Sequence, residues 1–351
     1  MILVYNPTCE MAVRAATVNY HPPQRLMFFE QRMASLMMFL ATKNDAVVAE
    51  KPSDAILDFW QRKGLDIPQF ITHSEAKQRV LQGQELKPWG LSKEVLYRFG
   101  GRALSDTFTD EHRLLLSRIS SVNLDKALEQ QQLPFWCSQN SRPQLITSAD
   151  ELQQLVFNSN SCVLKNLWSA SGRGVTIIDK EEYKKPTFKR YEDSLRIDGA
   201  VVYEPLLNRL VDFALLFDIK ENGEVVYLGK NFYRSDKSGR FGVELIGQNP
   251  LFEYEKNGQL PSDWEQIVSV AIIKAIETLN WSKIYTGPVG IDSMLYENSR
   301  GEVKLRICIE ANLRHTMGNV NMAISHIVGN GKVAEWGLDD IFNHDFLISN
   351  F

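Results

Sequence analysis

The chain has 351 residues, which is long for a single hydrophobic core and predicts two or three subdomains. Hydrophobic residues make up 44% of the chain and charged residues 23%, as in an ordinary globular protein. The net charge of -4 gives no general attraction to phosphate backbones or anionic lipids, so we expect neither nucleic acid nor a membrane as a partner.

The four cysteines, Cys9, Cys137, Cys162 and Cys308, lie far apart and form no Cys-x-x-Cys pair. Their spacing predicts neither a zinc site nor a disulfide framework, and it fits a reducing compartment. The most apolar short run, "MASLMMFLA" at 33–41, is too short to span a bilayer, and the N-terminus lacks the layout of a signal peptide. We therefore expect a cytoplasmic protein.

The first hundred residues alternate between strand-like and helix-like patterns. "MILVYNP", "DAVVAEKP" and "LDIPQFIT" are typical of short strands, while 24–40 and "SDAILDFWQRKG" have the apolar spacing of helices. Because parallel strands need crossover connections, this alternation predicts a small parallel α/β domain. "QGQELKPWGLSKEVLYRFGG" follows as a polar join, and 110–132 is largely helical.

The pattern then changes to β-hairpins. We expect hairpins in "SCVLKNLWSASGRGVTIID", "VDFALLFDIKENGEVVYLGKNFYR" and "VGIDSMLYENSRGEVKLRICIEAN", and a strand in "AVVYEPLL". One long helix at 264–279 interrupts them, with an apolar stripe at helical spacing. The second part of the chain is thus predicted to be α+β with mainly antiparallel strands.

The last hairpin carries a cluster of potential metal ligands. Side chains two apart share a face of a strand, so Glu310 and Asn312 lie on one face with Cys308, and the aliphatic residues between them face the core. A turn centred near Arg300 places Asp292 opposite Cys308, with Glu310 as its diagonal neighbour. Such oxygen ligands suit Mg²⁺, which usually takes one or two carboxylates plus substrate phosphates. A hairpin with scattered solvated charges is the alternative.

A second cluster lies in "VLKNLWSASGRGVTII". Lys165 ends an aliphatic run, and the small residues at 169–174 can fold backbone N–H groups around phosphate oxygens beside it. The loop is neither a Walker A motif nor a dinucleotide fingerprint, because the glycine spacing differs and a strand follows. An ordinary glycine-containing hairpin turn is the alternative.

The lysine strand with "SASGRGV", the "VVYEPLL" segment, the "VGID" strand and "IEANLRHTMG" together resemble, in this order, the ATP-grasp superfamily of carboxylate–amine or carboxylate–thiol ligases. The likeness covers about 114–328, and "YNPTCEMAV" and "KPWGLSKEVLYRFGG" also resemble poorly characterised bacterial members. It implies a pre-ATP-grasp-like α/β domain at 1–110 with a part in substrate binding. A small lobe at 111–205 with a flexible Gly-rich loop and a large lobe at 206–351 with the metal site would follow.

The resemblance also implies a metal and phosphate site. Asp292, Glu310 and Asn312 would hold Mg²⁺, or Mn²⁺ in its place, against the phosphates of ATP. Lys165 would contact phosphate, and Arg314 would stabilise the phosphoryl or tetrahedral state, so both are candidate catalytic residues. A flexible loop would close over the phosphates, and its residues are Ser169, Ser171, Gly172, Arg173 and Gly174.

Nucleotide contacts would also come from the next strand segment. Glu204 would hydrogen-bond the adenine, with backbone groups of Leu206 and Leu207 nearby. Asp212 resembles the acidic residue that reaches the ribose. For Glu204 and Asp212 the alternative is an ordinary strand exit with a solvated acid.

One phosphate lysine of the superfamily is missing. Its position, at the start of the helix before the "LP" turn, falls near Ser121, and Arg118 is the candidate to replace it. Lys230 and Arg234 are further candidates for phosphate or substrate contacts, with a solvated hairpin tip as the alternative. His315 is more often structural in such a loop than a substrate contact.

These assignments predict an ATP-dependent ligase. A substrate carboxylate would attack the γ-phosphate, and an amine would then attack the acyl phosphate to give an amide, ADP and phosphate. The substrates would be a small carboxylate and a small amine, such as amino acids or peptides, and a homodimer is one of the oligomeric states open to the chain. A phosphotransferase of the same fold and a nucleotide-binding protein without catalysis are the alternatives.

Overall fold

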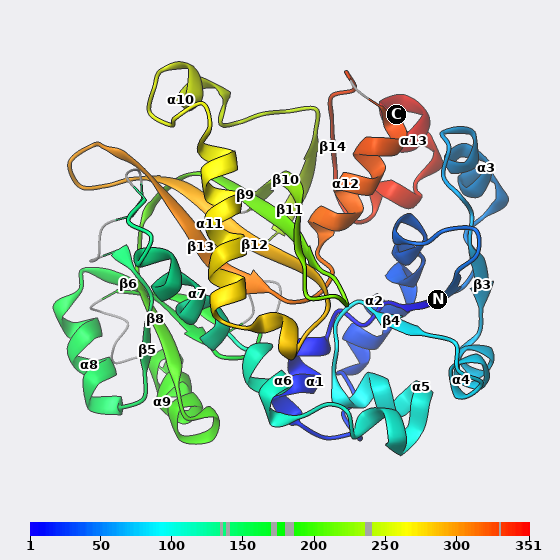
Figure 1. Cartoon of the computed structure of the whole chain (residues 1–351), viewed down its shortest axis with the longest axis horizontal. Coiled ribbons are helices and arrows are strands. Elements are labelled where there is room, and N and C mark those ends of the chain that lie inside the picture. The colour runs from blue at the N-terminus through cyan, green and yellow to red at the C-terminus, as the bar shows by residue number, and fades with distance from the viewer. Residues whose placement is uncertain (134–135, 138–140, 170–173, 180–185, 236–240, 330) are drawn as a thin grey trace.

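The computed structural model describes residues 1–133, 136–137, 141–169, 174–179, 186–235, 241–329 and 331–351. Within these ranges the chain forms three β-sheets connected by helices (Figure 1). The loop positions Ser171, Gly172 and Arg173, for which phosphate contacts are predicted, lie outside the described residues. In the described ranges, every helix is too short or too polar to cross a bilayer.

The N-terminal sheet is parallel and has the strand order β3-β2-β1-β4. Its strands are β1 (Ile2–Val4), β2 (Ala46–Val48), β3 (Gln69–Ile71) and β4 (Leu86–Pro88). The helices around it are α1 (Cys9–Ala15), α2 (Gln24–Met33), η1 (Ala34–Leu40), α3 (Asp54–Arg62), α4 (His73–Leu81) and α5 (Lys93–Ser105). The predicted parallel α/β domain is therefore present, and η1 continues the predicted 24–40 helix as a 3₁₀ helix.

The prediction of a polar join after the third strand is wrong, since this segment contains β4 and α5. β4 has only three residues, all half-buried, so it shows no β-branched run or alternation that a sequence pattern could reveal. α5 begins after Ser92, whose hydroxyl accepts a hydrogen bond from the N–H of Val95. Its glycine pair, typical of a loop, lies at a kink where Gly101 has φ of 68°.

The large sheet is antiparallel and has the order β13-β12-β9-β10-β11-β14. Its strands are β9 (Asn208–Ile219), β10 (Val225–Ser235), β11 (Phe241–Ile246), β12 (Gly287–Glu297), β13 (Val303–Asn312) and β14 (Ala334–Trp336). Helix α11 (Trp264–Thr278) packs its apolar stripe on one face, where Trp264 meets Phe213 at 5.5 Å between ring centroids. Helix α12 (Met317–Val328) packs on the other face, against Asn231 of β10.

The small sheet is antiparallel and has the order β5-β8-β6-β7. Its strands are β5 (Gln144–Ile146), β6 (Ser161–Asn166), β7 (Val175–Asp179) and β8 (Val201–Pro205). Helices α8 (Ala149–Asn158) and α9 (Pro186–Asp198) supply apolar side chains to its core. The remaining helices are α6 (Asp110–Leu115), α7 (Ile119–Glu129), α10 (Phe252–Lys256), η4 (Trp281–Lys283), η5 (Asp340–Phe342) and α13 (His344–Asn350).

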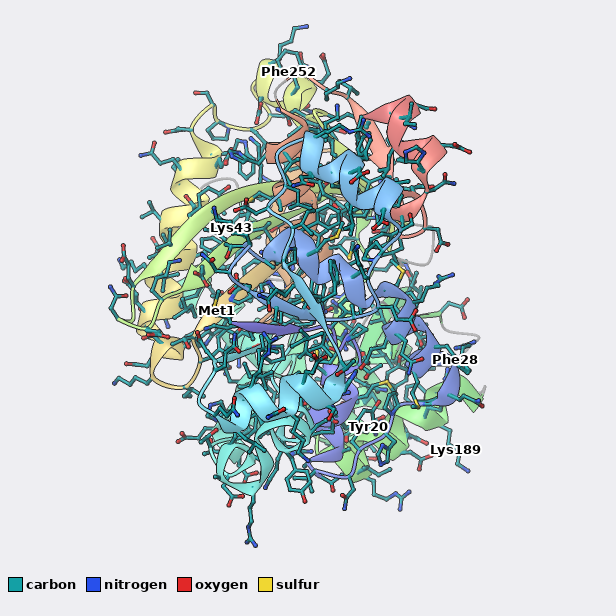
Figure 2. All side chains as sticks on the ribbon, turned by 90° about the vertical axis from the view of Figure 1, so that its right-hand side faces the viewer. Met1, Tyr20, Phe28, Lys43, Lys189 and Phe252 are labelled. Carbon is teal, nitrogen blue, oxygen red and sulfur yellow. The ribbon has the colours of Figure 1, made fainter. Side chains whose placement is uncertain are left out.

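The C-terminal helices lie against the N-terminal domain (Figures 1 and 2). Phe351 packs against Trp60 of α3 at 5.7 Å between ring centroids, and Lys63 donates to the carbonyl of Phe351 at 2.6 Å. One buried cluster therefore contains residues from both ends of the chain. This packing places the start of α1 beside the end of β13.

The β12–β13 register differs from the predicted one at its open end. Near the turn Met294 pairs with Arg306, as the sequence predicts. The register then shifts, so Asp292 pairs with Glu310 and the predicted pairing with Cys308 is wrong. Alternation alone cannot reveal such an irregularity, because a bulge changes the pairing without changing the composition of the strand. As a result the two carboxylates are direct neighbours.

Helix α7 runs along the free edge of β13. The hydroxyl of Ser121 accepts a hydrogen bond from the N–H of Ala311 at 2.9 Å, which satisfies an edge donor that would otherwise be unpaired. Arg306 lies two residues before Cys308, at a position that alternation assigns to the predicted polar face, yet it is only 1% exposed and forms an ion pair with Asp125 of α7. The middle of the polar face is thus covered, whereas Glu310 near the end of the strand stays partly exposed.

Candidate active site

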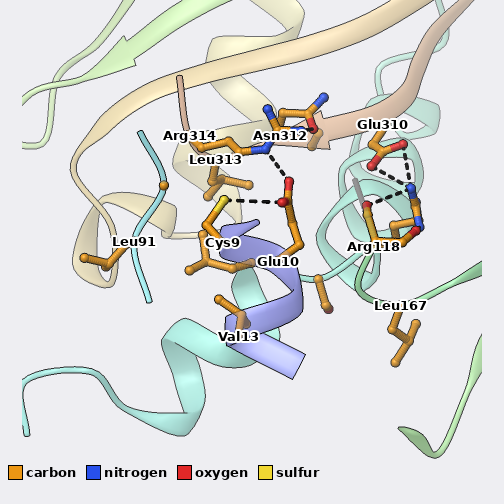
Figure 3. A pocket seen from close by; sticks show the side chains of 15 residues that line it. Cys9, Glu10, Val13, Leu91, Arg118, Leu167, Glu310, Asn312, Leu313 and Arg314 are labelled. Atoms are coloured by element: carbon orange, nitrogen blue, oxygen red, sulfur yellow. Dashed lines mark hydrogen bonds and ion pairs between the residues drawn. The ribbon is translucent and has the colours of Figure 1, made fainter. Parts of the chain in front are cut away.

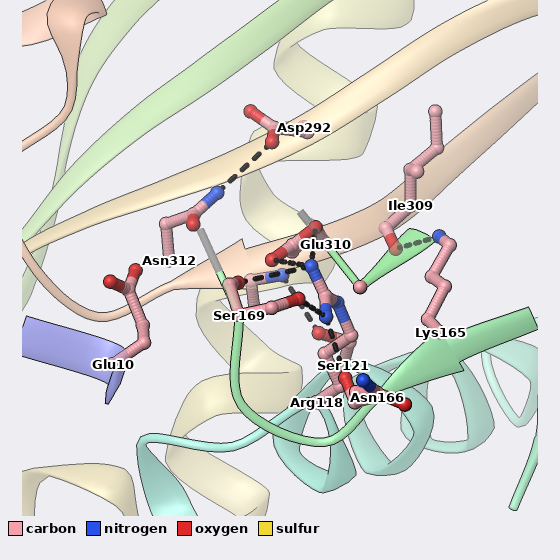
Figure 4. A network of polar contacts seen from close by, with 12 residues as sticks. Glu10, Arg118, Ser121, Lys165, Asn166, Ser169, Asp292, Ile309, Glu310 and Asn312 are labelled. Carbon is pink, nitrogen blue, oxygen red and sulfur yellow. Dashed lines mark hydrogen bonds and ion pairs between the residues drawn. The ribbon is translucent and has the colours of Figure 1, made fainter. Parts of the chain in front are cut away.

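Two carboxylates and an amide meet at the open end of the β12–β13 hairpin. Asp292 and Glu310 occupy opposed positions, so their side chains share one face of the sheet. Asn312 Nδ2 donates to Asp292 Oδ2 at 3.0 Å (Figure 4). Burial, reinforced by the charge of Glu310, raises the pKa of Asp292 to about 7. A cation between the two carboxylates would favour the ionised form of Asp292 by neutralising the negative charges.

The donor set fits Mg²⁺ in chemical type, because it consists of hard oxygen ligands on a rigid hairpin. Among the described residues, no group of three His, Cys, Asp or Glu side chains is arranged to hold a metal ion. The set therefore offers two carboxylates and one amide, and it leaves coordination positions for phosphate oxygens and water.

Arg118 connects Glu310 to the small sheet. It directly precedes α7 and is 4% exposed. Its Nη2 lies 2.9 Å from Glu310 Oε1 (Figure 4). Its Nη1 donates to the carbonyl of Asn166 at 2.6 Å and to the hydroxyl of Ser169 at 2.5 Å. The guanidinium thus holds the start of the predicted phosphate loop against a predicted metal ligand.

The far end of that loop returns at Gly174, which has φ of 66°. A Cβ there would lie 3.0 Å from Asn166 Nδ2 and Ser169 Oγ, so the two ends of the loop approach each other closely only because this residue is glycine. The loop that joins β6 to β7 is therefore anchored at both ends beside Arg118.

Lys165 and Glu204 lie side by side on β6 and β8. Lys165 Nζ is 2.9 Å from Glu204 Oε2, and it donates to the carbonyl of Ile309 on β13 at 3.3 Å. Both side chains are nearly buried, at 5% and 12% exposure. Figure 4 shows Lys165 reaching across to the strand that carries Glu310. The structure thus brings together the predicted phosphate lysine, the predicted adenine contact and the metal hairpin.

Arg314 connects the hairpin to the N-terminal domain. Its Nη2 donates to Asn312 Oδ1 at 2.8 Å, and its Nε donates to Glu10 at the start of α1 (Figure 3). Burial acts to lower the pKa of Arg314, but the carboxylate of Glu10 outweighs it and raises that pKa. The thiol of Cys9 donates to the other oxygen of Glu10 at 3.3 Å. Burial raises the pKa of Cys9, so this thiol stays protonated.

One pocket between the N-terminal domain and the hairpin is lined by Cys9, Glu10, Asn312 and Arg314, and it also reaches Arg118 and Glu310 (Figure 3). Its free volume is about 30 Å³. On the N-terminal side it lies at the carboxyl ends of β1 and β4, the point where the strand order reverses and ligands bind in open parallel sheets. Most of its uncharged walls are apolar, and these residues are Val13, Leu91, Leu116, Leu167, Ala311 and Leu313.

Asp212 lies on the same face of the large sheet as Asp292. Its strand neighbour is Met294, and Arg209 Nη1 lies 3.0 Å from its carboxylate. Burial raises the pKa of Asp212, with the charge of Arg209 acting against the shift. Leu206 and Leu207 form the short connection between β8 and β9 that precedes it. The contact of Asp212 with the ribose and that of the two leucines with the adenine stay predictions.

Lys230 is not brought to the site. It pairs with Leu215, whose neighbour on the next strand is Ile291, so it lies on the face opposite to Asp292. Its Nζ is 2.6 Å from Glu265 of α11. The glycine-rich hairpin suggested close approach to a ligand, but strand alternation turns this lysine towards a helix.

Arg234 and His315 also lie apart from the two carboxylates. Arg234 forms an ion pair with Glu335 at 2.7 Å. His315 is enclosed beside Trp89, and burial lowers its pKa to about 4, so it is neutral at physiological pH. A structural role for this histidine agrees with the interpretation that the sequence favoured.

Sequence reasoning did not single out Glu10 or Gly90 as site residues. Glu10 meets Arg314 across more than three hundred residues, and no local spacing signals such a contact. A Cβ on Gly90 would lie 2.3 Å from Cys9 Sγ, so only glycine lets the end of β4 approach α1 this closely. The run "YNPTCEMAV" directly after a strand of a parallel sheet was the one available signal.

Comparison with known proteins yields matches among solved structures. No protein-family model and no curated protein matches the chain. The biotin carboxylase domain of Hydrogenobacter thermophilus 2-oxoglutarate carboxylase, in complex with MgADP, ADP and bicarbonate, superimposes with a TM-score of 0.50 at 13% identity, over 94% of this chain and 69% of that one. Campylobacter jejuni biotin carboxylase superimposes with a TM-score of 0.50 at 14% identity, over 94% of this chain and 71% of that one. Rhizobium etli pyruvate carboxylase gives 0.52 at 15% identity, over 92% of this chain and 27% of that one.

The chain has the ATP-grasp fold. The predicted fold class is confirmed, with a parallel α/β domain followed by mainly antiparallel sheets. At these identities the likeness concerns the fold alone, and function has to be argued from the residues of the site. Asp292, Glu310 and Asn312 lie on the large sheet of this fold, and Lys165 and Glu204 face them from the small sheet.

Proposed function

We propose that the protein is an ATP-dependent ligase that activates a carboxylate as an acyl phosphate and joins it to an amine, with release of ADP and phosphate. The observation that carries this proposal is the meeting of Asp292, Glu310 and Asn312 with Arg118 and Lys165. Oxygen ligands for a divalent ion from the large sheet thus meet two cations for phosphate, Lys165 of the small sheet and Arg118 at the start of α7. The biotin carboxylase structures of the same fold, one with MgADP and one with an ATP-type ligand, support a nucleotide at this place.

The described ion pairs suggest how charged partners would be exchanged when the nucleotide and Mg²⁺ bind. Arg118 is paired with Glu310, and Lys165 with Glu204, so each cation already neutralises a carboxylate. Binding of Mg²⁺ by Asp292, Glu310 and Asn312 would release Arg118 towards phosphate oxygens. The bound ion would supply positive charge for the phosphates, as it does in phosphoryl transfer in general. Charge neutrality of the buried site is then kept through the exchange.

The proposed reaction has two steps. An oxygen of the substrate carboxylate bonds to the γ-phosphorus while the bond from that phosphorus to the bridging oxygen breaks, and ADP leaves. The amine nitrogen then bonds to the acyl carbon, the carbon–oxygen bond to phosphate breaks, and the nitrogen loses a proton. Arg314 would stabilise the negative charge in both steps, because its guanidinium contacts Asn312 at the metal hairpin.

The remaining residue roles are part of the same proposal. Glu204, Leu206 and Leu207 would bind the adenine, and Asp212 the ribose. The loop at 169–174 would cover the phosphates and keep water from the acyl phosphate. We assign 1–110 as a substrate-binding domain, 111–205 as the small lobe and 206–351 as the large lobe, each with one of the three sheets.

The experiment measures ADP and phosphate release with MgATP, across a panel of carboxylates with and without amines. The proposal expects ADP release that requires a carboxylate and an amide product that requires an amine. Lys165→Ala and Glu310→Gln should each abolish turnover, whereas Asp218→Asn, which removes a half-buried carboxylate of the large sheet that pairs with Lys220, should leave it unchanged. ADP release from a substrate that has no carboxylate would instead identify a phosphotransferase.

A further inference from the structure

The pocket beside the candidate site contains an ion pair that metal and nucleotide binding do not require. Glu10 belongs to the N-terminal domain and Arg314 follows β13, and their side chains are 14% and 17% exposed. Both line the pocket that also reaches Arg118 and Glu310 (Figure 3). A ligand in this pocket would therefore touch the Glu10–Arg314 pair at one end and the proposed phosphate site at the other.

Hydrogen bonds show which member of the Glu10–Arg314 pair lies next to the metal hairpin. Arg314 donates to Asn312, and Asn312 donates to Asp292, so the guanidinium is the member that contacts the proposed metal ligands. Glu10 belongs to α1, and its carboxylate accepts a hydrogen bond from the thiol of Cys9. The positive member of the pair is thus nearer to the chemistry, and the negative member is farther from it.

The charges of the described pocket residues cancel in pairs. Glu10 is paired with Arg314, and Arg118 with Glu310. A ligand that separated Glu10 from Arg314 would leave one of them without a partner if it carried a single charge, and unpaired buried charges are costly. A ligand with one ammonium and one carboxylate leaves both paired. Complementary charges of this kind determine which partner is accepted.

Beyond these two ion pairs, the described residues that line the pocket carry no charge. Leu91, Leu116 and Leu167 form apolar walls beside the ion pair, together with Val13 of α1. Such walls favour an apolar side chain and disfavour a phosphate or a second carboxylate. The present volume of about 30 Å³ admits such a ligand only after Glu10 and Arg314 move apart.

We propose that this pocket binds a small α-amino acid with an apolar side chain as the carboxylate that is activated, its carboxylate at Arg314 and its ammonium at Glu10. This inference rests on the proposed ligase function and names its donor substrate. The amino acid is the donor rather than the acceptor, because its carboxylate lies on the Asn312 side, towards the phosphate site. Its nitrogen, held as an ammonium by Glu10, has no free electron pair to act as a nucleophile.

The first test is calorimetric binding in the presence of Mg²⁺ and a non-hydrolysable ATP analogue. The probes are L-alanine, L-valine, L-leucine and L-phenylalanine, with 4-methylpentanoate and 3-methylbutylamine as analogues of leucine that lack one of the two charged groups. We expect at least one amino acid to bind, and each analogue that lacks a charged group to bind about 30-fold more weakly or worse than leucine. Failure of all four amino acids to bind at millimolar concentration would overturn the proposal.

The second test replaces Glu10 by glutamine. Glu10→Gln should weaken amino acid binding about 30-fold or more and leave binding of the ATP analogue unchanged, because in the complex the ammonium loses its partner while Arg314 still pairs with the ligand carboxylate. The matched control is Asp198→Asn, which breaks a second ion pair of α1, between Arg14 and Asp198 at 2.9 Å, whose residues do not line the pocket. Equal loss of binding in both variants would mean that Glu10 acts only by holding α1 in place, and would contradict the proposal.

The third test separates this inference from the ligase function. Hydroxylamine, used as a general acceptor with MgATP, converts any acyl phosphate to a hydroxamate, so the donor can be identified without knowing the acceptor. Hydroxamate from leucine but not from 4-methylpentanoate, with this preference lost in Glu10→Gln, is the expected result. Equal hydroxamate from both acids would overturn the inference and leave the ligase function intact. Amino acid binding that depends on Glu10 without any hydroxamate would contradict the ligase function instead.

Discussion

The ion pair between Asp125 and Arg306 gives a prediction with a magnitude that follows from burial. Both side chains are 1% exposed, and the pair joins α7 to β13. In Asp125→Asn the charge of Arg306 stays buried without its counter-ion, and Arg142, whose Nε lies 2.7 Å from Asp125 Oδ2, loses a carboxylate partner as well. Removing one partner of a buried pair costs about 3–5 kcal/mol. With a urea dependence of about 3 kcal/mol per M, the unfolding midpoint should fall by about 1 M or more.

The assay is urea unfolding followed by tryptophan fluorescence, with Asp218→Asn as the control. Asp218 pairs with Lys220 at the surface, so its loss should cost at most about 1 kcal/mol. Replacing both partners, as Asp125→Leu with Arg306→Met, should recover part of the lost stability, because the buried charge of Arg306 is removed while Arg142 keeps Glu129 as its partner. A midpoint for Asp125→Asn as high as that of the control would refute the reasoning.

Two further predictions concern single residues. Lys165→Met keeps the length of the side chain but removes its charge, so the affinity for the ATP analogue should fall about tenfold or more in calorimetry, and unchanged affinity would remove Lys165 from the site. Burial raises the pKa of Glu244 from 4.5 to about 8, so the folded protein keeps a proton that the unfolded chain releases, and the stability of the wild type should fall as pH rises through this window. Glu244→Gln should lose this dependence and exceed the wild type in urea unfolding near pH 8 but not near pH 5; parallel pH profiles would contradict the assignment.

The parts of the fold that the sequence predicted are those with a strong local pattern. The hairpins around Lys165 and Asp292 and the helix that begins at Trp264 have clear period-2 or period-3.6 patterns, and the structure contains all of them. β4 escaped prediction because its three residues, the last of which is Pro88, are too few to show a period. Its position next to β1 nevertheless decides where the pocket lies.

The candidate site was predictable to the extent that it lies on one hairpin or one loop. Asp292 and Glu310 were expected near each other, but their direct pairing depends on a register shift that alternation cannot show. Lys230 was predicted as a site residue because glycines lie near it in the sequence. Its pairing with β9 places it on the opposite face of the sheet, which local composition cannot show. The contact between Glu10 and Arg314 depends on how the N-terminal domain packs against the large sheet, which no local signal encodes.

The central claim is that Asp292, Glu310 and Asn312 bind a divalent ion together with an adenine nucleotide. Its most direct test is calorimetric titration of the wild type with a non-hydrolysable ATP analogue, with and without Mg²⁺, and of Asp292→Asn under the same conditions. We predict binding that is at least about tenfold tighter with Mg²⁺ in the wild type, and loss of this difference in the variant. Equal affinity with and without Mg²⁺ in the wild type, or an unchanged magnesium effect in Asp292→Asn, would contradict the claim.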